Sequence, residues 1–186
     1  LVLIEGVMLA ELSARTLWGG LTIFAFIVAA LVAGTAIALW LFGRGNRIAR
    51  WLGAALLASL LIVLAEVIAG LTTDSPRALA ETKNLLAGAP APYFWFHVIL
   101  GMILHIVLLL AGPRKALAGW IAALALLGVL AEKIWMLAAG QAQPWLALPR
   151  SDYSPTWVEL LVVVGMLALG WLIFQLVDQF ILPKKA

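Results

Sequence analysis

Five long apolar stretches, separated by short polar or turn-forming segments, dominate the hydrophobic pattern of the chain. A helix needs about 20 apolar residues to cross a bilayer, and each stretch reaches that length. None shows the two-residue alternation of a barrel strand, and each is apolar around its whole circumference. The pattern predicts an all-α, polytopic transmembrane helix bundle forming a single membrane domain. The predicted spans are 17–42, 48–72, 92–112, 116–139 and 156–181.

The composition supports a lipid environment. Of the 186 residues, 65% are hydrophobic and 11% are charged, and the mean hydropathy is +1.11. Soluble domains are about half apolar and about a quarter charged, so a soluble globular protein is excluded. The chain has no cysteine, so it cannot by itself build an iron–sulfur cluster or a thiolate zinc site. We expect no haem or metal in this chain and no nucleic-acid partner, since its net charge of +3 is explained by membrane topology.

The segments between the spans alternate in charge. Those after the first, third and fifth spans carry only basic residues, whereas those on the opposite side carry equal numbers of acidic and basic residues. The positive-inside rule therefore places the all-basic segments and the C-terminus in the cytoplasm. We expect a multi-pass protein of a bacterial or archaeal cytoplasmic membrane. The cytoplasmic basic residues are Arg44, Arg47, Arg50, Arg114, Lys115, Lys184 and Lys185.

The first residues are apolar but reach only halfway across a membrane. As a helix, Leu1 to Ala10 would extend about 15 Å, and no charged leader of a signal peptide precedes them. We interpret Leu1–Glu11 as the outer end of a helix that begins before this sequence. The chain would then be the C-terminal part of a longer protein with further helices. A short interfacial segment on the outer surface is the alternative.

The two longest connections are both predicted on the outer side. In the 73–91 segment the pattern predicts a surface helix from Pro76 to Leu86, capped by Asp74 or Ser75 and ended by the Gly-Ala-Pro run that starts at Gly88. The 140–155 segment carries three prolines and two aromatic residues, which is typical of an ordered loop. A partner subunit is expected to dock on these connections or on the preceding helices.

Ionisable side chains at membrane depth are costly and often mark a pathway or site. Counted from the predicted span ends, five of them lie in the outer third of the membrane on four helices. Neighbouring titratable groups in a medium of low dielectric constant have coupled protonation, which suits proton exchange. We predict a proton path or a quinone-proximal cluster at this depth. The five residues are Glu66, His97, Glu132, Lys133 and Glu159, and His105, deeper in the third span, is a sixth candidate for the same path.

Each of these groups has a structural alternative. Glu66 or Glu132 can pair with Lys133, and Glu159 suits the N-terminal dipole of the last helix, where we favour a capping role. Because adjacent helical residues point about 100° apart, we do not expect Glu132 and Lys133 to neutralise each other directly. Each should find a partner on another helix, unless Lys133 extends to the outer interface.

His97, Gly101 and His105 recur at four-residue steps on one helix face, where Gly101 allows close approach of another helix. Histidines on membrane helices suggest haem ligation, but two on one helix cannot clamp one haem and the chain has no third. We favour interhelical hydrogen bonds over a proton relay for both histidines. Trp135 could stack on a quinone ring, although core packing is the stronger expectation.

The order of several motifs resembles the NrfD / polysulfide reductase membrane-subunit (PsrC-like) family, in its C-terminal part. The motifs are ELSARTLWGG, FIVAALVAGTAIAL, APAPYFWFHVILGMILHIVLLL, AEKIWMLAAGQ and YSPTWVELLVVVGMLALGWLIFQL, and the resemblance extends over nearly the whole chain. The resemblance implies eight or more helices, a bound menaquinone or ubiquinone, and electron exchange with an iron–sulfur subunit of a multi-subunit complex. Lys133 stands where this family often has arginine, and the first helices, which hold much of the quinone pocket, are absent from this sequence.

The sequence thus favours a membrane subunit of a quinone-linked oxidoreductase, which supplies scaffold and a possible proton path. An ion or small-molecule transporter half is the second interpretation, because polar clusters near the midplane also mark substrate routes. A purely structural anchor, whose polar residues only join helices, is the third. In the first interpretation the quinone would bind mainly to helices outside this sequence, and redox metals would belong to partner subunits.

Overall fold

The structure is a computed structural model that describes residues 2–11, 19–42, 46–110, 118–142 and 156–180. All regular structure in these ranges is helical, and they contain no strand. The chain divides into two compact units, residues 1–150 and 151–186, called here the bundle unit and the C-terminal unit. Each is described by itself.

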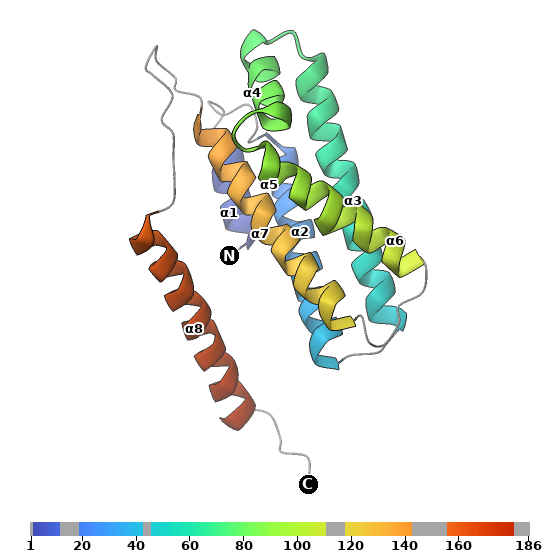
Figure 1. The fold of residues 1–186 in the computed structure, drawn as a ribbon, viewed down its shortest axis with the longest axis vertical. Coiled ribbons are helices and arrows are strands. Elements are labelled where there is room, and N and C mark those ends of the chain that lie inside the picture. The colour runs from blue at the N-terminus through green and yellow to red at the C-terminus, as the bar shows by residue number, and fades with distance from the viewer. Residues whose placement is uncertain (1, 12–18, 43–45, 111–117, 143–155, 181–186) are drawn as a thin grey trace. The chain divides into compact units, whose positions relative to one another are not determined.

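Five helical segments are long and apolar enough to cross a membrane, and each coincides with a predicted span to within a few residues. The all-α polytopic architecture is therefore confirmed. Figure 1 shows the helices of the bundle unit, with the short helix α4 near one end of α3 and the short helix α1 beside α2. The helices are α1 (Val2–Ala10), α2 (Leu21–Phe42), α3 (Asn46–Thr72), α4 (Pro76–Ala87), α5 (Ala91–Trp95), η1 (Phe96–Ile103), α6 (Leu104–Leu110), α7 (Ala118–Ala142) and, in the C-terminal unit, α8 (Trp157–Phe180).

Small residues line the interior of the bundle unit. α2 packs against α1, α3 and α7, and η1 packs against α7. The alanines Ala36, Ala122 and Ala125 are almost completely buried, whereas the large side chains of Trp40 and Trp120 are exposed. Lipid tails are as apolar as leucine, so membrane helices associate through close packing at small residues rather than through burial of large ones. Larger side chains, such as Leu52 and Met102, fill the rest of the interior.

The third span is one continuous helix with a π-helical middle. α5, η1 and α6 follow one another without a break, and the Leu104 amide bonds to the carbonyl of Ile99, five residues earlier. π-helical turns are rare and occur frequently at functional sites. The hydrophobic pattern did not predict this segment, because the hydrogen-bond register of a uniformly apolar helix leaves no trace in its sequence. His97 and Gly101 both lie in it.

The surface helix predicted in the 73–91 segment is confirmed as α4. The Ser75 hydroxyl accepts from the Ala78 amide at 3.4 Å, and at the other end the Gly88 amide donates to the Asn84 carbonyl at 2.7 Å. α4 packs on α3, where a Cβ at Gly70 would collide with the buried Thr82. The missing side chain at Gly70 therefore brings α4 down onto the end of α3.

The N-terminal stretch forms the short helix α1, which packs against the start of α2. A Cβ at Gly6 would lie 3.1 Å from the Cα of Ile23, so the two backbones are close. Whether further helices precede α1 stays a prediction. Most of the predicted ordered loop after α7, residues 143–155, lies outside the described part of the chain.

Candidate functional site

The centre of the candidate site is a contact between the third span and α7. The Nε2 atom of His97, on η1, lies 3.6 Å from Oε2 of Glu132, on α7. Both side chains are 3% exposed. Two titratable groups thus meet in the interior of the bundle unit, where breaking a buried polar contact is costly.

Lys133 extends this contact toward the surface. Its Nζ lies 2.9 Å from Oε1 of Glu132 and 3.8 Å from the centre of the Phe26 ring on α2, and its side chain is 28% exposed. The expectation that Glu132 and Lys133 do not pair directly is wrong. The 100° separation describes where their Cβ atoms point, whereas the flexible stems of both side chains bring the charged ends together. Each of the two residues also has the expected contact on another helix. Glu132 contacts His97 on η1, and Lys133 contacts Phe26 on α2.

Trp135 determines which nitrogen of His97 carries a proton. The indole Nε1–H donates to Nδ1 of His97 at 3.2 Å. Because an indole N–H can only donate, Nδ1 must be the unprotonated nitrogen, which leaves the His97 proton on Nε2, the atom facing Glu132. Trp135 also packs edge-on against Phe94, with ring centroids 5.5 Å apart. Its side chain is buried, as the core-packing expectation required.

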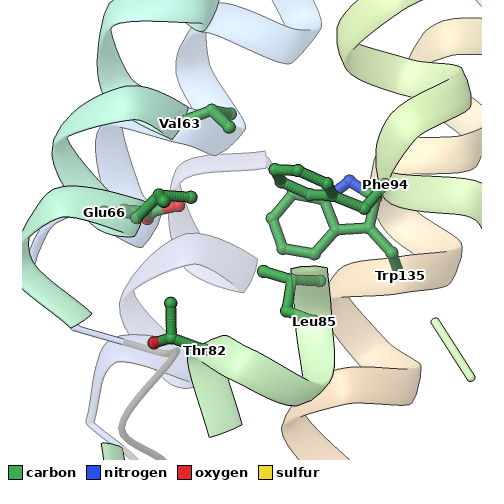
Figure 2. A pocket seen from close by; sticks show the side chains of 7 residues that line it. Val63, Glu66, Thr82, Leu85, Phe94 and Trp135 are labelled. Carbon is green, nitrogen blue, oxygen red and sulfur yellow. The ribbon is translucent and has the colours of Figure 1, made fainter. Parts of the chain in front are cut away.

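Glu66 reaches the same region from α3. Its carboxylate interacts electrostatically with both Glu132 and Lys133. No hydrogen bond or ion pair joins it to another residue in the described part of the chain. Figure 2 shows the Glu66 side chain directed into the space between α3 and the ring of Phe94, with Thr82 nearby. The structure therefore brings together four of the residues selected from the sequence, namely Glu66, His97, Glu132 and Lys133.

A cavity of about 10 Å³ lies beside Glu66 and Trp135. This volume holds one water molecule. A quinone ring is larger than this cavity, and its stacking on Trp135 stays a prediction. The residues that line this cavity are Val63, Glu66, Val67, Thr82, Leu85, Phe94 and Trp135.

His105 lies two helical turns from His97 and has a different partner. Its Nε2 is 2.9 Å from the carbonyl oxygen of Ile121 on α7, and the side chain is fully buried. Between the two histidines the backbones of Gly101 and Gly128 touch, since a Cβ at Gly101 would lie 2.9 Å from the Cα of Gly128. The expected close helix approach and the interhelical hydrogen bonds of both histidines are confirmed.

Glu159 belongs to the C-terminal unit and lies in the first turn of α8. Its carboxylate accepts from the Thr156 amide at 2.6 Å and from the Thr156 hydroxyl at 3.0 Å, while its own amide donates to that hydroxyl at 3.3 Å. This reciprocal arrangement is a capping box at the start of α8. The capping role favoured from the sequence is confirmed.

Sequence reasoning missed two hydroxyl groups of the site. Ser59 is buried on α3 and borders a second cavity together with His97 and Glu132. Its position seven residues before Glu66 places both on one helix face, a spacing that could have identified it. Thr82 is buried under α4 against α3. The strong amphipathic pattern of α4 marks its buried face but not what that face covers.

No family model, no curated protein and no solved structure matches this chain. The family resemblance therefore depends on the sequence motifs alone.

Proposed function

We propose that the chain is an integral membrane subunit of a quinone-linked, multi-subunit oxidoreductase that exchanges electrons with an iron–sulfur partner subunit. In this proposal the bundle unit handles protons, and the quinone binds on helices other than those described. The observation that carries the proposal is the buried contact between His97 and Glu132, together with the neighbouring Glu66 and Lys133.

Two arguments support this assignment over its alternatives. Quinone reduction consumes two protons for every two electrons, so a quinone-linked complex needs titratable groups within the membrane, and the order of the motifs points to such a complex. A purely structural cluster would pair its polar groups with one another. Glu66 is poorly explained that way, because it makes no hydrogen bond or ion pair within the described ranges.

A transporter half is the second candidate, favoured by the π-helical turn at His97. A substrate route would have to pass the point where the Gly101 and Gly128 backbones touch. At that contact the two backbones leave no space for a substrate to pass between η1 and α7. The redox assignment does not need a continuous passage, since a proton can be delivered to the cluster from one side.

The proposal is tested on the native complex purified from its membrane. We expect iron–sulfur subunits and quinone to copurify. Glu132→Gln should lower quinol turnover about 100-fold, as expected when a proton-transfer group is removed, without dissociating the complex. Glu159→Gln is the matched control, because glutamine also completes a capping box. Wild-type turnover in both Glu132→Gln and Lys133→Met, or a complex without redox subunits, would overturn the assignment.

A further inference from the structure

Two small cavities flank the buried contact between His97 and Glu132. The first lies beside Glu66 and Trp135, as described above. The second, also about 10 Å³, is bordered by Ser59, His97 and Glu132 among its lining residues. A cavity of this size holds one water molecule, provided that the walls supply two to four polar partners.

The first cavity meets this condition. The Glu66 carboxylate offers two acceptor oxygens on one side. The Thr82 hydroxyl, which also lines this cavity, donates to the Ala78 carbonyl at 2.9 Å, and its oxygen keeps the capacity to accept a hydrogen bond. The remaining walls are apolar or aromatic. A water here would hydrate Glu66 at the end of the bundle unit that α4 covers.

The second cavity has three polar side chains around it. Ser59 supplies a hydroxyl, Glu132 a carboxylate, and His97 the Nε2–H that the hydrogen bond from Trp135 leaves on this nitrogen. The cavity also borders Gly101 and Gly128, whose backbones touch. That contact closes η1 against α7 on the side of His105.

We propose that each cavity binds one water molecule, and that these waters open the Glu66, His97 and Glu132 cluster to proton exchange at the α4 end of the bundle unit. This inference deepens the proposed function and rests on it for its biological purpose. It assigns two water sites and the direction of access, which the redox proposal leaves open.

The proton balance is simple. A hydronium ion at the α4 end gives a proton to the Glu66 carboxylate and is left as water. When Glu66 then passes this proton to Glu132, an O–H bond breaks at Glu66 and another forms at Glu132. Glu66 is then ready to take the next proton. Protonation of Glu132 weakens its ion pair with Lys133, and the second water can hydrogen-bond the neutral carboxyl group. No electron moves in this step, so no oxidant or reductant is needed.

Hydroxyl-radical footprinting of the full chain in its native complex tests the water sites, because radiolysis of bound water labels the side chains beside it. We expect labelling of Phe94 and Trp135 in the first cavity and of Val129 in the second. Met102 is fully buried and borders neither cavity, so it serves as the dry reference despite its greater intrinsic reactivity. Labelling of the cavity residues no higher than that of Met102 would overturn the proposal.

A cavity-filling variant tests the access route. Val63→Leu adds a methylene group that fills part of the first cavity. This variant should abolish labelling of Phe94 while leaving Val129 labelled. Leu64→Phe is the matched control, because Leu64 is the next residue and its side chain is exposed. Thr82→Val is a second variant, which keeps the shape of the contact with Gly70 but removes the hydroxyl partner. Unchanged labelling of Phe94 in both Val63→Leu and Thr82→Val would contradict the first site.

Infrared spectroscopy in acidic D₂O tests proton exchange without any redox activity. The carboxyl band that is missing in Glu66→Gln identifies Glu66, and the one missing in Glu132→Gln identifies Glu132. Both bands should exchange rapidly in the wild type and several-fold more slowly in Val63→Leu. Equal exchange rates in Val63→Leu and the wild type would overturn the access route, whatever the turnover assay shows. If the complex shows no quinol turnover, but the carboxyl protons exchange rapidly in the wild type and more slowly in Val63→Leu, only the redox assignment would be overturned.

Discussion

Two parts of the interface between the third span and α7 bury a histidine in different ways. Near α4, His97 meets the Glu132 carboxylate and the Trp135 indole. Beyond the Gly101–Gly128 contact, His105 meets a backbone carbonyl. Both side chains are buried, yet only the first has a titratable partner. Burial of an ionisable residue in a membrane bundle is therefore weak evidence of function, and the identity of its partner is what separates a candidate site from a packing contact.

The largest effect on stability is expected at Glu132. Glu132→Ala removes the carboxylate that faces His97 and Lys133, and breaking a buried pair costs about 3 kcal/mol. The free energy of unfolding in detergent, measured by denaturant titration, should fall by this amount. Leu130→Ala, at an exposed position of the same helix, is the control. Equal losses in the two variants would mean that the pair contributes nothing specific.

The glycine contact between the two regions should be nearly as sensitive. Gly128→Ala places a Cβ 2.7 Å from the Cα of Gly101, so the backbones must separate, at a cost of about 2 kcal/mol. Gly34→Ala is the matched control, because a Cβ there meets no atom within 4 Å. Thermal unfolding should show a lower midpoint for Gly128→Ala alone. A midpoint unchanged from the wild type would contradict the close contact.

Replacing each histidine by leucine tests the comparison itself. His105→Leu loses one interhelical hydrogen bond, worth about 1 kcal/mol in a membrane protein, and should leave quinol turnover unchanged. His97→Leu should reduce turnover as well as stability. Parallel measurements of unfolding free energy and turnover would separate the two. Similar loss of turnover in both variants would remove the distinction between the regions.

The smallest effect is expected at the cap of α4. Ser75→Ala removes the side-chain acceptor for the Ala78 amide and should destabilise this helix by about 0.5 kcal/mol. Hydrogen exchange of the α4 amides should become correspondingly faster. Lys83→Ala, an exposed change in the same helix, should have less effect. Faster exchange confined to α3 would indicate that Ser75 acts through another contact.

Much of the site could be predicted because depth in a membrane follows from position in a span. Counting from the span ends placed Glu66, His97 and Glu132 at one level, and the structure brings them together. The pairing of Glu132 with Lys133 could not be obtained in this way. It depends on side-chain torsions, which the direction of the Cβ atoms does not determine.

The amino-acid sequence by itself determines the class of protein, the five spans and the surface helix α4. Apolar length, charge balance and capping residues are local properties, and membrane helices satisfy their backbone hydrogen bonds within a single segment. Only the tertiary structure decided the π-helical turn, the protonated nitrogen of His97 and the two cavities. Each depends on how side chains from separate helices fill a shared interior, and uniformly apolar spans do not encode which of their faces meet.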